Sequence, residues 1–111
     1  MELYFCISMQ RAGNTLLGSI LNQNPDITLT ANSPLTEIIY QLDLIKTNDE
    51  IPQQLNFPHN KSLDNVIKKT FYTYSETFKT KYVINRCNWG SDGNLELLEK
   101  YFDKKIKFLI L

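Results

Sequence analysis

Six consecutive residues have the types needed to bind a phosphate or sulfate group. They are Arg11, Ala12, Gly13, Asn14, Thr15 and Leu16. If they open a helix, its unpaired N–H groups and partial positive charge attract an anion, and Gly13 permits the positive φ that curls successive N–H groups around it. Arg11 adds a fixed charge with paired donors. The segment 10–16 therefore predicts an anion-binding turn.

The elements that must position this turn are typical of an α/β domain. Residues 3–8 form an almost continuous apolar run, as expected of a strand covered on both faces. Leu16, Leu17, Ile20 and Leu21 then make one helical face over residues 15–23. Further strands are expected at residues 27–30, 82–87 and 107–111, and further helices beginning at Ser33-Pro34, at Ser62 and near residue 95. This order predicts a parallel sheet flanked by helices, in a single domain over residues 1–111.

The apolar positions indicate which side chains form the core. The helix beginning at Ser62 has an apolar face made by Leu63, Val66, Ile67, Phe71, Tyr74 and Phe78. The only two cysteines, Cys6 and Cys87, lie inside apolar, strand-like runs. We therefore expect buried free thiols rather than a disulfide or a metal-binding pair.

Charge and hydropathy argue against several classes of function. Twelve basic residues balance twelve acidic ones, so the net charge gives no attraction to nucleic acid or to an anionic membrane. The N-terminus lacks the features of a signal peptide, and no stretch approaches the ~20 apolar residues that span a bilayer. A cytoplasmic protein without a membrane segment or a nucleic-acid partner is the expectation.

The segment does not have the Walker A pattern of nucleotide kinases and other NTPases. No lysine follows Gly13, and no glycine lies five residues before it. The hydroxyl that coordinates Mg²⁺ after that lysine also has no direct counterpart, so no metal is implied. A P-loop kinase is therefore the least favoured of the nucleotide-binding alternatives.

The segment instead resembles the 5′-phosphosulfate-binding loop of PAPS-dependent sulfotransferases, which has the form P-[KR]-S-G-[ST]-T-[LW]. Arg11, Gly13, Thr15 and Leu16 match this loop, whereas Gln10, Ala12 and Asn14 depart from it. Residues 17–26, with an Asn-Pro-Asp ending, and the Ser-Pro-Leu at 33–35 are similar to the Golgi-type and bacterial branches of the family. Trp89 with the Asn-Leu-x-Leu-Leu at 94–98 also resembles a segment of those proteins.

The resemblance implies a P-loop NTPase-like fold and transfer of a sulfuryl group from PAPS to a hydroxyl or amine. The acceptor class stays open between a carbohydrate, a peptide and a small molecule. The predicted donor site consists of residues 11–16, which would hold the 5′-phosphosulfate end without a metal. A non-catalytic remnant, or a module that only binds nucleotides or anions, is the alternative.

Two residues are candidates for the catalytic groups that such a transfer needs. The family uses a His or Glu base and a basic side chain near the bridging oxygen. Arg86 ends a predicted strand, at the edge of the sheet where ligands collect, although a surface salt bridge is an equal alternative. His59, the only histidine, lies in a proline-rich connection and has a solvated side chain as its alternative. Glu37 and Trp89 are weaker candidates, because a first-turn acid and a packing anchor explain them better than a role in the site.

The sequence stops on an apolar strand, residues 107–111. In the family, an Arg and a Ser that bind the 3′-phosphate follow this strand, and they have no counterpart here. We therefore expect the N-terminal part of a longer domain, truncated after the third core strand. An exposed strand of this kind favours self-association.

Overall fold

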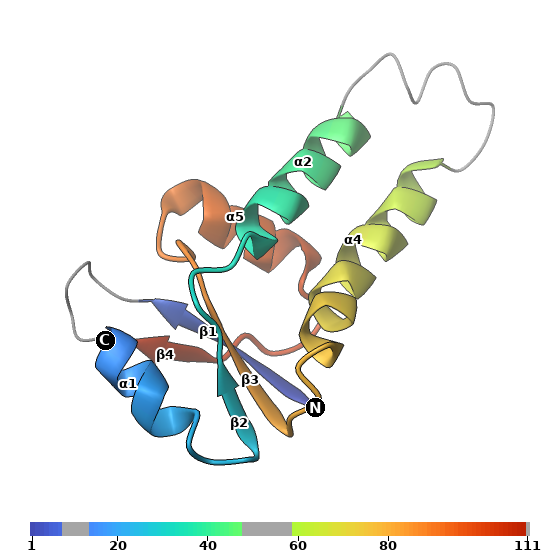
Figure 1. Cartoon of the computed structure of the whole chain (residues 1–111). Helices are drawn as coiled ribbons and strands as arrows, with labels where there is room; N and C mark the ends of the chain where they lie inside the picture. The colour runs from blue at the N-terminus through green and yellow to red at the C-terminus, as the bar shows by residue number, and fades with distance from the viewer. Residues whose placement is uncertain (8–13, 48–58, 111) are drawn as a thin grey trace.

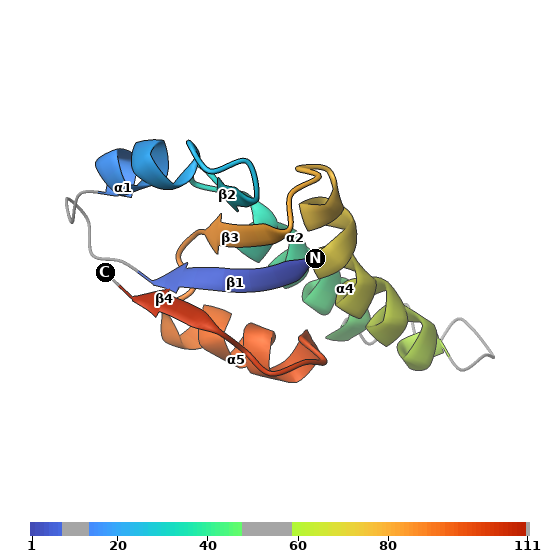
Figure 2. The same cartoon turned by 90° about the horizontal axis from the view of Figure 1, so that it is seen from below.

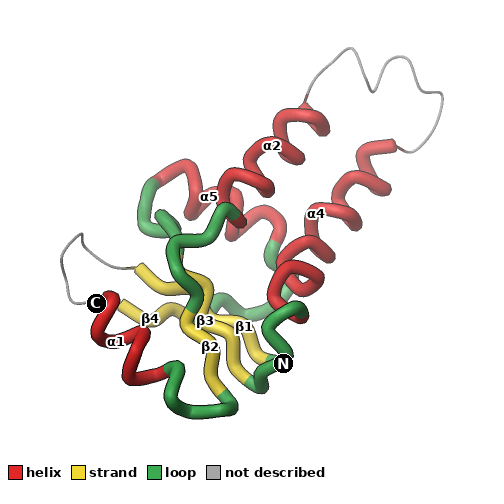
Figure 3. Tube along the Cα trace, in the orientation of Figure 1, coloured by secondary structure: helices red, strands yellow, loops and turns green. Residues whose placement is uncertain are grey.

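The computed structural model describes residues 1–7, 14–47 and 59–110, which form an α/β structure with a four-stranded, all-parallel sheet flanked by helices (Figures 1 and 3). The elements follow one another as β1 (Glu2–Ile7), α1 (Asn14–Leu21), β2 (Ile27–Leu29), α2 (Leu35–Thr47), α4 (His59–Glu76), β3 (Tyr82–Arg86), α5 (Asp92–Tyr101) and β4 (Phe108–Ile110). The predicted α/β class and the parallel sheet flanked by helices are confirmed.

The strands lie in the order β2-β3-β1-β4. In the pairing of β1 with β3, Cys6 lies beside Arg86, so both strands end at the same edge of the sheet. The helices α2, α4 and α5 pack together, whereas α1 lies apart from them beside β2 (Figures 1 and 2). The chain crosses the sheet in one direction after β1 and in the opposite direction after β2 and β3. Because such crossovers are right-handed, α1 lies on one face of the sheet and α2, α4 and α5 lie on the other.

The core lies between the sheet and the three packed helices. Four aromatic rings meet there, those of Phe5, Phe71, Trp89 and Phe102, with centroid separations of 5.0–6.2 Å. Along β3 the burial alternates, with Val83 and Asn85 buried and the residues between and beside them half-buried. Because alternate side chains of a strand point to opposite faces, Arg86 is on the side away from this core.

Two helix boundaries differ from those predicted. The helix expected from Ser62 begins at His59, and Ser62 lies inside it. An ion pair of 2.5 Å between Lys46 and Asp64 links α2 with the early turns of α4. Contact with α2 therefore stabilises the start of α4, which lies before the capping residue that the sequence suggested. The helix expected from Pro34 begins at Leu35, because the Pro34 carbonyl accepts the first helical bond from the Ile38 N–H.

The predicted core was too large on two helices. On α1, Leu16 and Ile20 are 67% and 54% exposed, because α1 packs mainly on β2 and no other element covers its outer side in the described structure. On α4, Val66 is 51% exposed. Phe78 lies beyond the end of α4, where Lys79 at φ 56° turns the chain out of the helix, and it is exposed.

The short strand expected at residues 27–30 is present in the sheet, so β4 is its fourth strand rather than the third core strand. Residues 27–29 form a full member of it, since Ile27, Thr28 and Leu29 pair in register with β3. With only three residues, β2 is too short for its periodicity to distinguish it from a turn.

Candidate functional site

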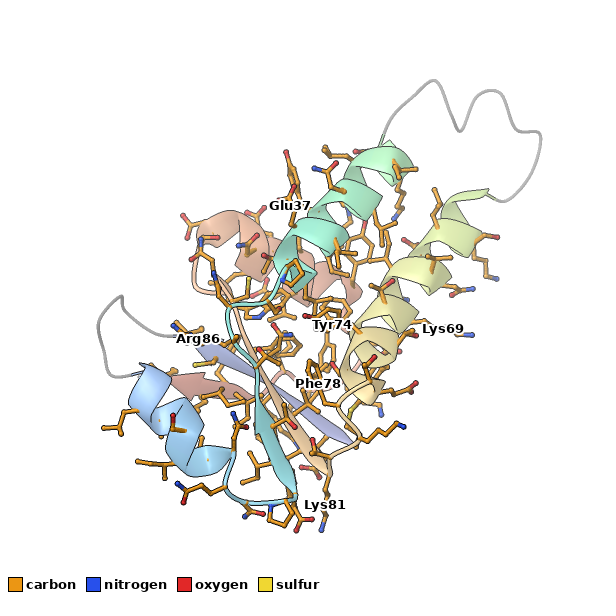
Figure 4. All side chains as sticks on the ribbon, in the orientation of Figure 1. Glu37, Lys69, Tyr74, Phe78, Lys81 and Arg86 are labelled. Atoms are coloured by element: carbon orange, nitrogen blue, oxygen red, sulfur yellow. The ribbon has the colours of Figure 1, made fainter. Side chains whose placement is uncertain are left out.

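Arg86 is the predicted site residue that the structure places most clearly. It ends β3 at the carboxyl edge of the sheet (Figure 4). A pocket of about 470 Å³ lies between α1 and the ends of β2 and β3, and its lining consists of Gly18, Ser19, Asn22, Leu29, Thr30, Ala31 and Arg86. Among the described residues of this lining, Arg86 is the charged one. No ion pair of Arg86 occurs within residues 1–7, 14–47 and 59–110, so the salt-bridge alternative finds no support there.

The main chain at Arg86 is held by the segment that follows β2. The Arg86 N–H donates to Thr30 Oγ1 (2.8 Å), and the Arg86 carbonyl accepts from the Ser33 N–H (2.8 Å). The Thr30 N–H donates to the Ile84 carbonyl (3.0 Å), which continues the β2–β3 ladder past Leu29. Thr30 and Ser33 are both buried.

A buried polar cluster adjoins Arg86 on the core side. Asn85 Oδ1 accepts from Ser33 Oγ (3.0 Å) and from Trp89 Nε1 (2.9 Å). Because the indole N–H can only donate, this pair fixes which way the Asn85 amide points. Its Nδ2 is buried and has no hydrogen-bond partner in the described structure.

Cys87 follows Arg86 and is half-buried. Its thiol donates to the Ser33 carbonyl (2.8 Å) and lies 3.0 Å from Thr36 Oγ1. Neither Cys6 nor Cys87 is in a disulfide within the described structure, and Cys6 is fully buried whereas Cys87 is half-buried.

The proposed anion-binding segment lies mostly outside the described residues. Arg11, Ala12 and Gly13 belong to the part that is not described, and Asn14, Thr15 and Leu16 form the first turn of α1. The strand before the segment and the helix after it are both present, as predicted. The segment thus connects the carboxyl end of β1 to α1, and β1 is the neighbour of β3.

The other residues considered for catalysis or ligand binding do not join Arg86 in a site. His59 is the first residue of α4, at the end of that helix far from the sheet (Figure 1), rather than in a loop. Glu37 is exposed and accepts a hydrogen bond from Gln41 (2.8 Å), and it lies on α2 apart from Arg86 (Figure 4). Trp89 has no exposed surface, so it is a packing anchor rather than the wall of a ligand site.

A second polar cluster joins α2 to α5. Asp43 accepts hydrogen bonds from the Tyr101 hydroxyl and from Lys100 (3.1 Å). Partial burial by itself raises the pKa of Asp43, but these hydrogen bonds outweigh it and hold the pKa below its ordinary value. Burial and the bond to Asp43 raise the pKa of Tyr101. The cation of this cluster, Lys100, is paired with Asp43 (3.1 Å), so we interpret the cluster as a link between α2 and α5.

Sequence patterns missed Thr30, Ser33 and Asn85 as members of the site. Ser33 was assigned only a role at the start of α2, which it has in part, since Leu35 N–H donates to its hydroxyl at 3.3 Å. The signal that was available is the polar Asn85 inside an otherwise apolar strand, because a buried amide needs partners. No group of three or more His, Cys, Asp or Glu residues suited to a metal ion occurs in the described part of the chain.

Comparison with known proteins assigns the chain to no family. No family model matches the sequence, and no curated protein is similar enough to count as a match. Among the described helices, none is both long enough and apolar enough to span a membrane.

Proposed function

We propose that this chain is a P-loop-like domain of the PAPS-dependent sulfotransferase type. In this proposal residues 11–16 hold the 5′-phosphosulfate end of PAPS, and the sulfuryl group passes to a hydroxyl or amine acceptor. The observation that carries it is the position of Arg86 at the carboxyl end of β3, next to the strand that leads into the segment 10–16.

The strand order supports this location for a ligand. After β1 the chain crosses to β2 on one side, and after β3 it crosses to β4 on the other. Ligands of open α/β sheets bind outside the carboxyl ends of the strands at such a reversal. The order β2-β3-β1-β4 in an all-parallel sheet is compatible with a P-loop-like fold.

The proposed chemistry needs charge stabilisation above all. The acceptor oxygen or nitrogen forms a bond to sulfur while the bond from sulfur to the donor phosphate oxygen breaks, and that oxygen keeps the electron pair. Arg86, which has no acidic partner in the described structure, would stabilise the negative charge that develops there. The acceptor proton must pass to a base. The described residues that line the pocket beside Arg86 include no acidic residue and no histidine.

Equilibrium binding of adenosine 3′,5′-bisphosphate, the product of the donor, tests the proposal. We expect Arg11→Ala to weaken binding by roughly tenfold or more, because hydrogen bonds to charged groups contribute about 1.5–3 kcal/mol. Lys69→Ala is the matched control, since Lys69 is an exposed cation on α4, remote from Arg86 (Figure 4). Equal losses in the two variants, or no binding by the unchanged protein, would contradict the assignment.

An anion-binding module without transfer is the second candidate. It is favoured by the lining of the pocket around Arg86, whose described residues include no carboxylate or histidine to accept the proton. Incubation with PAPS and mixed carbohydrate, peptide and alcohol acceptors separates the two candidates. Binding with no release of adenosine 3′,5′-bisphosphate supports the module, and acceptor-dependent release supports the transferase.

A further inference from the structure

We infer that Thr30 and Ser33 are positioning residues that hold Arg86 at the ligand pocket. The inference rests on the proposed function, because it assigns to Arg86 the role of binding an anion. Neither residue needs to touch the ligand for this effect. They act on the main chain of β3, from which the Arg86 side chain extends.

The first observation concerns how β2 ends. Regular pairing of β2 with β3 stops at Leu29, yet the contact between the two segments continues. At the next position the Thr30 hydroxyl, instead of a main-chain carbonyl, accepts the Arg86 N–H at 2.8 Å. The Thr30 side chain therefore completes the β2–β3 ladder at Arg86, whose cation lines the pocket.

The second observation is that Ser33 binds three consecutive residues of the same strand end. Its hydroxyl donates to Asn85 Oδ1 (3.0 Å), its N–H donates to the Arg86 carbonyl (2.8 Å), and its carbonyl accepts from the Cys87 thiol (2.8 Å). The strand end is thereby fixed on both sides of Arg86. Asn85 is itself fixed by the buried indole of Trp89.

Burial makes these bonds consequential. Thr30 and Ser33 are 7% and 6% exposed, so water does not readily replace a lost partner there. Thr30 also lines the pocket together with Arg86, so the residue that binds the Arg86 main chain lies at the same pocket as the Arg86 side chain. Since a misplacement of about 1 Å can cost on the order of 100-fold in a site that depends on geometry, a loosened main chain at Arg86 weakens its grip on an anion.

The test compares two identical substitutions on one strand. Thr30→Val removes the acceptor of the Arg86 N–H and keeps the shape of the side chain. Thr28→Val is the control, because it also removes the acceptor of a hydrogen bond, from Thr80 (2.9 Å), but that bond lies before the start of β3 rather than at Arg86. Thr30→Ser restores a hydroxyl and serves as the rescue.

The first readout needs no ligand. Amide hydrogen exchange at Arg86 should be about tenfold faster or more in Thr30→Val, and close to that of the unchanged protein in Thr28→Val and Thr30→Ser. Unchanged protection of the Arg86 amide in Thr30→Val would overturn the positioning role, whether or not the protein binds nucleotides.

The second readout is affinity for adenosine 3′,5′-bisphosphate in a double-mutant cycle. We expect Thr30→Val alone to weaken binding about fivefold or more, but to cause no further loss when Arg86→Ala is already present. Additive losses would overturn the inference, because Thr30 would then act without Arg86. A complete lack of binding by the unchanged protein refutes the proposed function instead, while the exchange experiment still decides whether Thr30 holds the strand end.

Discussion

The indole of Trp89 is buried among Phe5 and Phe71, with ring centroids at 5.0 and 6.2 Å. Its N–H donates a hydrogen bond to Asn85 Oδ1, which also accepts one from the Ser33 hydroxyl. At this residue the sequence left two readings, a ligand wall and a packing anchor. Because Trp89 has no exposed surface, it is a packing anchor. Its hydrogen bond also orients the side-chain amide of Asn85, the residue before Arg86.

Two substitutions of Trp89 should separate its packing from its hydrogen bond. Trp89→Phe keeps an aromatic ring and removes the donor, so we expect a loss of about 1–2 kcal/mol in the free energy of unfolding. Trp89→Ala removes the ring as well and should cost about 3–5 kcal/mol. Urea unfolding followed by far-UV circular dichroism measures both. Equal losses would mean that the ring contributes little beyond its N–H.

Asp43 should make stability depend on acid pH. A carboxyl pKa below the ordinary 3.8 means that the folded state favours the charged form, so this stabilisation is present above about pH 4 and is lost as the pH falls through the folded pKa. We expect Asp43→Asn to lower the free energy of unfolding by about 1 kcal/mol near neutral pH and to have little effect near pH 3 or below.

The control for Asp43 is Glu99→Gln, which removes the charge of an exposed carboxylate on α5. Urea unfolding at the two pH values should show a difference for Asp43→Asn that shrinks on acidification and no comparable change for Glu99→Gln. A difference that stays constant with pH would contradict the role of the Asp43 charge.

Among the elements, α1 is joined to the edge of β2 by the side chain of Asn22. Asn22, just after the helix, accepts from the Leu29 N–H (2.7 Å) and donates to the Leu29 carbonyl (3.0 Å). In a parallel ladder, alternate residues direct their polar groups to opposite neighbours. Because Thr30 bonds to β3, the Leu29 groups face the outer edge of β2, and Asn22 occupies that edge as a neighbouring strand would.

Asn22→Ala should therefore loosen α1 and the edge of β2 together. Two lost hydrogen bonds predict a local loss of about 2 kcal/mol, seen as faster hydrogen exchange at the Leu29 amide. Gln23→Ala is the control, since Gln23 is the exposed neighbour with no side-chain hydrogen bond in the described structure. Equal exchange in the two variants would show that helix packing, rather than Asn22, holds α1.

At the scale of elements, the sequence predicted the existence of each strand and helix better than its ends. The sequence identified β1, β2, β3, β4 and the four described helices, because apolar runs and helical spacing reflect local backbone geometry. The start of α4 at His59 and the exposed residues Leu16 and Ile20 of α1 were not predicted. Both depend on which neighbour packs against the helix, and periodicity carries no information about the neighbour.

For the whole molecule, one core between the sheet and three helices should dominate stability. Phe71 on α4 is fully buried and contacts Phe5, Trp89 and Phe102. Val66, five residues earlier on the same helix, is 51% exposed.

This contrast yields a paired prediction. Phe71→Ala should lower the free energy of unfolding by about 3–5 kcal/mol, a large share of the roughly 5–15 kcal/mol typical of a domain. Val66→Ala should change it by about 0.5 kcal/mol or less. Chemical denaturation measures both, and a similar loss in the two variants would mean that the core extends over the outer face of α4.

The sequence by itself determined the α/β class, the parallel sheet, the position of Arg86 at a strand end and the segment 10–16 between β1 and α1. Each of these follows from residue types over a short stretch of chain. Only the tertiary structure decided that β1 lies between β3 and β4, and that Ser33 and Thr30 bind the main chain of Arg86. Those contacts join residues more than 50 positions apart, as Ser33 and Asn85 are, 52 positions from one another. Such pairs form only when the strands align, and no local pattern encodes that alignment.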